Sequence, residues 1–166
     1  MFDACALVFC PKLLIFMRVV IQRVGCSSVK VKGAVVGKIS KGLLVFLGVA
    51  HDDDKEDVQW LAKKLVNLRV FNDEAGKMNL SLFDVSAEIL MISQFTLYAS
   101  TKKGNRPSYV KAADPVKGEI LYNYFIEHLR KAYKVKVATG IFGAMMQVDI
   151  TNDGPVTIIM DSKNKE

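Results

Sequence analysis

Residues 42–49 read Gly-Leu-Leu-Val-Phe-Leu-Gly-Val, and this run is the strongest indication of the architecture. The run has the length of a strand and is apolar throughout, with no alternation between apolar and polar residues. A strand of this kind is buried on both faces. It therefore predicts a central strand in a sheet that other layers cover on each side.

A helix is predicted directly after this strand. The triplet Asp52-Asp53-Asp54 offers N-caps, and Glu56 and Asp57 follow three residues after Asp53 and Asp54, as in a capping box. Apolar residues then recur at helical spacing as far as about Arg69: Val58, Leu61, Leu65 and Leu68. Clustered acids can also bind a metal, but at a helix start they match the positive end of the helix dipole. We interpret the triplet as caps.

Further strands and a second helix lie on both sides of this unit. Strand patterns cover residues 18–24, 28–32, 35–39, 89–95, 135–139, 145–151 and 156–161. Asp114-Pro115 is an N-cap followed by proline at the first helical position. The helix after it has one apolar face, formed by Ile120, Leu121, Tyr124, Phe125, His128 and Leu129, on which His128 is interpreted as a packed histidine. The prediction is one α+β domain with a mostly antiparallel, curled, barrel-like sheet and two flanking helices.

The composition agrees with one basic globular domain. The chain has 166 residues, 51% of them hydrophobic, and a net charge of +6. Three cations fall within the five residues Lys102-Lys103-Gly104-Asn105-Arg106. A local excess of this kind favours a polyanionic partner such as nucleic acid, although a generic basic surface is the competing interpretation.

Cysteine, histidine and apolar runs indicate neither a metal site nor a membrane span. The three cysteines, at positions 5, 10 and 26, show no zinc-ligand spacing, and the only histidines are His51 and His128. The expectation is reduced thiols in the cytoplasm, no metal and no cofactor. No apolar stretch has the roughly 18 residues of a membrane span.

Residues 1–16 form an N-terminal extension, and Met17 opens the first strand pattern of a domain covering 17–166. The extension is apolar like a signal peptide, but Asp3 and Pro11-Lys12 argue against one. Two explanations stay open, an upstream in-frame start codon and an artefact.

Two short segments carry the candidate chemistry. Ser93-Gln94-Phe95-Thr96-Leu97 closes a buried strand with two hydroxyls and an amide, and Asn152-Asp153-Gly154-Pro155-Val156-Thr157 puts Gly and Pro where a strand should run. The usual catalytic motifs are missing, including a serine nucleophile elbow and a phosphate-binding glycine loop. Hydroxyls, an amide and backbone N–H groups can orient a substrate and stabilise an oxyanion, so water or the substrate must supply nucleophile and base.

From Met17 to about Asp161 the chain resembles the D-aminoacyl-tRNA deacylases. Six segments carry the resemblance, in one order: Met17-Arg18-Val19-Val20-Ile21-Gln22-Arg23-Val24, Asn67-Leu68-Arg69-Val70-Phe71, Ser93 to Leu97, Lys103-Gly104-Asn105-Arg106-Pro107, Gly140-Ile141-Phe142-Gly143-Ala144-Met145-Met146, and Asn152 to Thr157. Residues 1–16 lie outside the family pattern.

The resemblance implies a homodimeric hydrolase with a cross-subunit active site. It implies cleavage of the ester between a D-amino acid, or glycine, and the 3′-terminal adenosine of tRNA, which is chiral proofreading in translation quality control. Gly154-Pro155 corresponds to the family's Gly-cisPro motif, which enters the site of the other subunit. Its two parallel carbonyls would accept the substrate ammonium and leave no space for an L side chain.

The resemblance also implies residue roles. The catalytic segment is Ser93, Gln94, Phe95 and Thr96, with the Phe95 and Thr96 N–H groups and the Gln94 amide on the ester carbonyl. Thr96 as nucleophile is disfavoured because no base accompanies it. Arg23 would support the Gly-Pro motif, against the alternative of a plain surface cation. An adenosine pocket is implied for the segment Phe142, Gly143, Ala144, Met145 and Met146, although the two methionines could instead be ordinary core residues. Contacts with tRNA phosphates are implied for Lys102, Lys103 and Arg106.

Two other functions stay open. One is a nucleic-acid-binding module without catalysis, which would use the basic loop with Phe142 and Tyr109. The other is a related enzyme with a trans Gly-Pro bond that acts on L-alanyl-tRNA.

Overall fold

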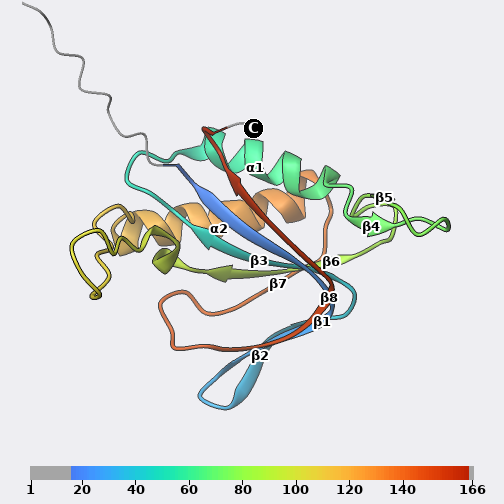
Figure 1. Ribbon diagram of the computed structural model, residues 1–166, viewed down its shortest axis with the longest axis horizontal. Coiled ribbons are helices and arrows are strands. Elements are labelled where there is room, and N and C mark those ends of the chain that lie inside the picture. The colour runs from blue at the N-terminus through green and yellow to red at the C-terminus, as the bar shows by residue number, and fades with distance from the viewer. Residues whose placement is uncertain (1–15, 165–166) are drawn as a thin grey trace, which may run out of the picture.

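The structure, a computed structural model, describes residues 16–164 (Figure 1). The extension expected at residues 1–16 therefore lies, except for Phe16, outside the described residues, as do Cys5 and Cys10. The elements follow in the order β1 (Arg18–Val31), β2 (Ala34–Ile39), β3 (Gly42–Gly48), α1 (Lys55–Asn67), β4 (Phe71–Asn72), β5 (Met78–Leu80), β6 (Glu88–Ser93), the 3-10 helix η1 (Phe95–Tyr98), α2 (Pro115–Ala132), β7 (Val137–Thr139) and β8 (Gln147–Asp161).

The main sheet has the order β2-β1-β3-β6-β7, and β8 pairs with β1. Strand β1 is antiparallel to β2, β3 and β8, whereas β3–β6 and β6–β7 are parallel. The sheet curls until its two end strands, β2 and β7, approach one another. The distance at Gly37 of β2 shows how close they are, since a Cβ there would lie only 2.5 Å from the Thr139 carbonyl oxygen of β7. This nearly closed, mostly antiparallel sheet confirms the predicted α+β class.

Strands β1 and β8 are longer than predicted. The sequence suggested a break in each, near Gly25 and at Gly154-Pro155, but both strands continue through these positions. The ladder between them shifts register between Gln22 and Val24 and again between Val24 and Cys26. Such irregularities bend a strand without ending it. Proline is tolerated in β8 because this strand pairs only with β1 among the described strands, so its other edge has no ladder to lose.

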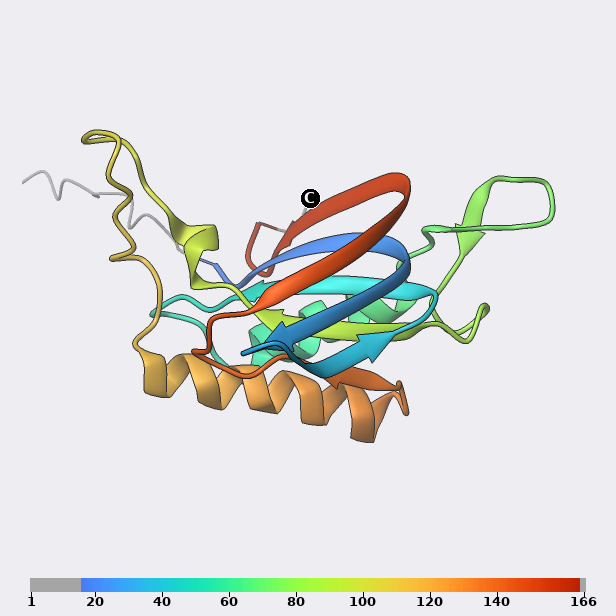
Figure 2. The same cartoon turned by 90° about the horizontal axis from the view of Figure 1, so that it is seen from below.

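Two hydrophobic cores lie on opposite faces of the sheet. The larger one packs α1 and α2 against the sheet and includes Leu43, Val45, Leu61 and Phe125. The smaller one fills the inside of the curl and consists of Val24, Val29, Ile39, Leu44, Leu90 and Ile92. Figure 2 shows α2 lying along one side of the sheet. Successive residues of β3 enter different cores, which confirms that both faces of this strand are buried.

The buried face of α2 differs in part from the prediction. Leu121, Phe125 and Leu129 are buried as expected, but Ile120 is 57% exposed, and Tyr122 and Ile126 take its place in the core. His128 is half-buried and stacks on Tyr124, with a centroid distance of 5.9 Å, as expected for a packed histidine. Within residues 16–164, no helix has the length and apolar character needed to cross a membrane.

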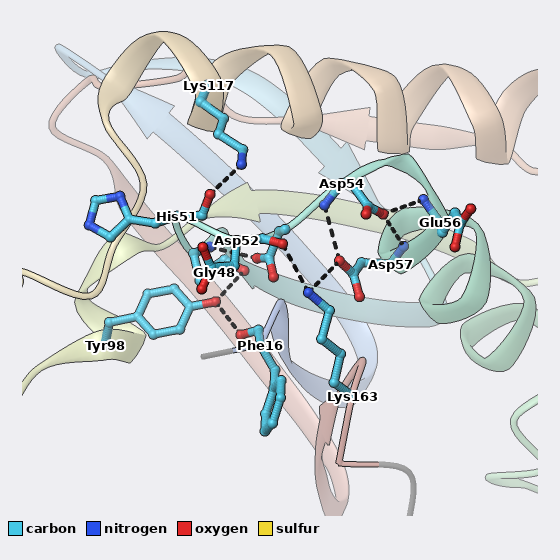
Figure 3. Close-up of polar contacts among 12 residues, drawn as sticks. Phe16, Gly48, His51, Asp52, Asp54, Glu56, Asp57, Tyr98, Lys117 and Lys163 are labelled. Atoms are coloured by element: carbon cyan, nitrogen blue, oxygen red, sulfur yellow. Dashed lines mark hydrogen bonds and ion pairs between the residues drawn. The ribbon is translucent and has the colours of Figure 1, made fainter. Parts of the chain in front are cut away.

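The cap of α1 forms as predicted, but with Asp54 alone as the N-cap (Figure 3). Its carboxylate accepts hydrogen bonds from the Glu56 and Asp57 N–H groups at 2.8 and 3.3 Å, and the Asp57 carboxylate accepts from the Asp54 N–H at 3.0 Å. Among the described residues no group of acids, histidines or cysteines could hold a metal ion. Asp53 points into the protein instead and is 2% exposed.

Asp53 is expected to make stability depend on pH. Burial raises the pKa of its carboxyl to about 7. The negative charge of the neighbouring Asp57 raises this pKa further, whereas the hydrogen bond from the Ala50 N–H and the positive charge of Lys163 lower it. The unfolded chain ionises this group near pH ~4, so the fold loses stability as the pH rises from about 4 through 7. At pH 8 the free energy of unfolding of Asp53→Asn, measured by urea unfolding, should therefore exceed that of the wild type by about 2–4 kcal/mol. At pH 4 the two proteins should differ little.

Asp52→Asn is the matched control, because Asp52 is the exposed neighbour. It should follow the wild type at both pH values. An Asp53→Asn advantage of equal size at pH 4 and pH 8 would contradict the raised pKa.

Candidate active site

A pocket of about 750 Å³ opens where three strands end. Strands β3, β6 and β7 run parallel, so their carboxyl ends meet at one edge of the sheet. The pocket is lined by residues that follow these ends: Val49 after β3, Gln94, Phe95 and Thr96 after β6, and Phe142, Gly143, Ala144, Met145 and Met146 after β7, with Ser93 at the end of β6 itself. The first turn of α2 closes the remaining side with Asp114, Pro115 and Gly118. The structure therefore brings together the two segments that the sequence proposed as catalytic and as adenosine-binding.

The turn after β6 presents two backbone N–H groups. The Gln94 N–H donates to the Leu47 carbonyl at 2.7 Å, which ties the strand end to β3. The N–H of Leu97 makes the first bond of η1, to the Gln94 carbonyl at 3.2 Å. The N–H groups of Phe95 and Thr96 precede this bond and so have no partner within the helix. Two adjacent donors of this kind suit a carbonyl oxygen that gains negative charge.

Four polar side chains of the pocket, those of Gln94, Thr96, Asp114 and Tyr122, already make hydrogen bonds within the protein. The Gln94 amide donates to the Thr96 hydroxyl. Asp114 is the one carboxylate among the described lining residues, and it caps α2 by accepting from the Val116 and Lys117 N–H groups at 3.1 and 3.0 Å. Burial raises the pKa of the Tyr122 phenol, whose hydroxyl donates to the Met91 carbonyl at 2.8 Å. The pocket can therefore bind and polarise an ester, but no free general base lies in its described wall.

The segment after β7 forms an apolar wall. The Phe142 ring contacts the Tyr122 ring, with a centroid distance of 5.7 Å, and packs over Gly118, where a Cβ would lie 3.3 Å from the ring. Met146 is half-buried and packs against the smaller core, but Met145 is 92% exposed, so its interpretation as ordinary core is wrong. One feature of the sequence indicates that α2 belongs to this wall. Gly118 is a glycine within a helical pattern, which is unfavourable for the helix but leaves space for the Phe142 ring.

Arg23 lies away from this pocket and is buried, with 6% of its surface exposed. Its guanidinium donates to the Asp153 carbonyl at 3.1 Å, to the Val70 carbonyl at 2.5 Å and to the Asn72 side-chain oxygen at 3.2 Å, and it pairs with the Asp153 carboxylate at 3.1 Å. The interpretation as a plain surface cation is therefore wrong. Arg23 holds the backbone next to Gly154.

Gly154 and Pro155 do not line the pocket of their own chain. Both are exposed, and the peptide bond between them is cis. Gly154 has φ of +129°, which only glycine adopts freely. The structure of a single chain therefore separates this motif from the catalytic segment.

The predicted phosphate contacts lie on a projecting loop (Figure 2). Lys102, Lys103 and Arg106 are all exposed. The loop is closed at its base by two hydrogen bonds of 2.9 Å between Ser100 and Ser108. Tyr109 directly follows this loop and lines the pocket, so the basic loop is continuous with the wall of the pocket.

Comparisons with known proteins identify the family of the chain. The family described as D-Tyr-tRNA(Tyr) deacylase matches residues 20–161. The chain is 54% identical to a D-aminoacyl-tRNA deacylase of Thermosipho melanesiensis over 147 residues, covering 89% of this chain and 98% of the relative. It is 54% identical to one from Bacteroides thetaiotaomicron over 150 residues, covering 90% and 100%, and 56% identical to one from Bacillus velezensis over 147 residues, covering 89% and 99%.

Two solved structures share the fold. One, titled c-Myc DNA Unwinding Element Binding Protein, is 44% identical with a TM-score of 0.82, covering 87% of this chain and 97% of the other. The second, titled a probable eukaryotic D-amino acid tRNA deacylase, is 19% identical with a TM-score of 0.77, covering 87% and 98%. At that identity the second comparison concerns the fold alone.

Proposed function

This chain belongs to the D-Tyr-tRNA(Tyr) deacylase family, and we propose that its pocket holds the 3′-terminal adenosine of a D-aminoacyl-tRNA. Its activity is that of a D-aminoacyl-tRNA deacylase, an ester hydrolase. The observation that carries the proposal is the meeting of the Ser93–Thr96 and Phe142–Met146 segments in one pocket of about 750 Å³. The partner is tRNA, and the reaction belongs in the cytoplasm, where charged tRNA is used.

The adenosine would lie against the wall formed by residues 142–146. The Phe142 ring and the Met146 thioether offer flat and polarisable surfaces to a base. Gly143 and Ala144 have no side chain, or a short one, that could fill the space. Met145, 92% exposed, would lie at the rim and cover the base from solvent.

The ester would lie over η1. The Phe95 and Thr96 N–H groups and the Gln94 amide would stabilise the charge on the carbonyl oxygen, and Ser93 would fix the strand end. Water, oriented by the ribose 2′-hydroxyl beside the ester, would attack the carbonyl carbon. The bond from that carbon to the ribose 3′-oxygen breaks, and this oxygen takes up the proton that the water loses, which gives the free amino acid and tRNA. Thr96 is not the nucleophile in this proposal, because its hydroxyl accepts from Gln94 and no free base lies beside it.

Chiral selection would come from a second copy of the chain. Gly154 and Pro155 are exposed, and two large apolar residues of the same strand, Ile150 and Ile159, are 41% and 64% exposed. We propose a homodimer in which this strand carries the Gly154-Pro155 motif into the partner's pocket, held in place by Arg23. The motif would reject an L side chain by steric exclusion, whereas glycine, with no side chain, would be cleaved.

Hydrolysis of three substrates tests the function: D-tyrosyl-tRNA, L-tyrosyl-tRNA and glycyl-tRNA, with no added metal. Rapid loss of the D and glycyl esters with the L ester spared is expected. Binding of all three without turnover would instead support the nucleic-acid-binding alternative. The mass of the active species in solution should be that of a dimer, and an active monomer would exclude the cross-subunit site.

The basic loop predicts salt-dependent tRNA binding. Each cation that contacts a phosphate releases counterions, so Lys103→Glu with Arg106→Glu should reduce the slope of log affinity against log salt by about 2. At low salt the affinity should fall on the order of 100-fold. Filter binding of tRNA across a salt series measures both. Lys63→Glu with Lys64→Glu, on the exposed face of α1, changes the net charge equally and should leave the slope as in the wild type.

A further inference from the structure

Tyr109 places an aromatic ring at the mouth of the pocket. It is half-buried within a loop of mostly exposed residues, and its neighbour Val110 is 77% exposed. Its ring meets the Phe95 ring edge to face, with a centroid distance of 5.0 Å and an interplanar angle of 72°. Phe95 is itself 58% exposed. Two contacting and partly exposed aromatic rings therefore line the pocket at its mouth, outside both hydrophobic cores.

The backbone on both sides of Tyr109 is held by hydrogen bonds. Before it, Ser108 pairs with Ser100 through two bonds of 2.9 Å. After it, the His51 ring Nε2 bonds the Val110 carbonyl at 2.7 Å, and the Ala113 N–H donates to the Val49 carbonyl at 2.9 Å. The carbonyl of Tyr109 itself accepts from the Ala112 N–H at 2.9 Å. The ring is thus positioned before any ligand arrives, which reduces the entropy cost of binding.

The position of Tyr109 matches the path of a single strand that leaves the pocket. The pocket has room for the terminal nucleoside, and the cations Lys102, Lys103 and Arg106 precede Tyr109 in the same loop. A nucleotide between these two places would lie over the Phe95–Tyr109 pair. Bases stack on aromatic rings with little dependence on sequence.

We propose that Tyr109, with the ring of Phe95, forms a stacking subsite for the nucleotide that precedes the terminal adenosine. This inference rests on the proposed function, since it needs the adenosine in the pocket. Tyr109 acts here as a positioning residue. It holds the acceptor end so that the ester lies over η1, and it takes no part in the chemistry.

The test compares a long and a short substrate, D-tyrosyl-tRNA and 3′-O-(D-tyrosyl)adenosine, which lacks the preceding nucleotide. Tyr109→Ala should lower the ratio of kcat/KM for the long substrate to that for the short one on the order of 10-fold, through KM. Tyr109→Phe, which keeps the ring, should retain the wild-type ratio. Val110→Ala, in the same loop, is the matched control and should also retain it.

A second measurement does not depend on how the variants fold. With the wild-type protein, a D-tyrosyl oligonucleotide that is abasic at the preceding position should react on the order of 10-fold less efficiently than the intact one. Exchanging that base for another should change the rate only slightly. An abasic substrate cleaved as well as the intact one would overturn the inference, as would a Tyr109→Ala variant with the wild-type ratio. A wild-type protein that cleaves neither D-tyrosyl-tRNA nor the adenosine ester would instead overturn the proposed function.

Discussion

Gly154→Ala is expected to lower kcat/KM for D-tyrosyl-tRNA by at least about 100-fold. Gly154 has φ of +129°, so any side chain there is strained. An added Cβ would lie 2.8 Å from the Val156 Cγ2, 2.9 Å from the Val156 backbone nitrogen and 3.2 Å from the Arg23 guanidinium. The backbone must therefore move, and the carbonyls proposed to select chirality move with it. Steady-state hydrolysis measures the loss.

Gly25→Ala is the control for this variant. A Cβ at Gly25 would meet its nearest atoms, both of Thr151, at 3.9 and 4.0 Å, which is ordinary van der Waals contact. Its activity should stay within a few-fold of the wild type, and its stability within about 1 kcal/mol. If Gly154→Ala kept full activity and full preference for the D ester, the motif would have no part in selection.

Arg23→Met should destabilise the protein by about 2–4 kcal/mol and reduce activity even under conditions where the variant is folded. The substitution keeps an unbranched side chain in the space but removes every donor. The buried Val70 carbonyl then loses its bond to the guanidinium, and the Asp153 carbonyl loses the contact that holds the segment before Gly154. Leaving a buried acceptor unsatisfied costs more than a normal hydrogen bond contributes. Urea unfolding measures the first effect and hydrolysis the second.

Arg18→Met is the matched control on the same strand. Arg18 pairs with Asp161 through two contacts of 2.7 and 2.8 Å, but its side chain is 39% exposed. This pair is bidentate and only part-buried, so its loss should cost about 1 kcal/mol, less than the loss of the buried Arg23 contacts. Equal losses in the two variants would mean that the buried contacts of Arg23 have no special importance.

Much of the local structure could be predicted because it depends on neighbours in the sequence. The apolar run of β3, the capping box at Asp54 and the Asp114-Pro115 start of α2 all formed near their predicted positions. Two strand breaks were predicted wrongly, at Gly25 and at Gly154-Pro155, where strong breaking residues lie in long bent strands. Strand β1 has partners on both sides and irregular register there, so the ladder continues where local propensity predicts an end.

Both helices, most strands, the basic loop and the segments that resemble the deacylases could be predicted from the sequence alone, because period, capping and residue type are local properties. The three-dimensional fold brings Ser93–Thr96 and Phe142–Met146 into one pocket, since their meeting depends on the parallel pairing of β6 with β3 and β7. It also decided that Arg23 is buried against Asp153 and that Tyr109 contacts Phe95. The physical reason is that a strand's pattern shows which of its faces is buried but not which strands lie beside it.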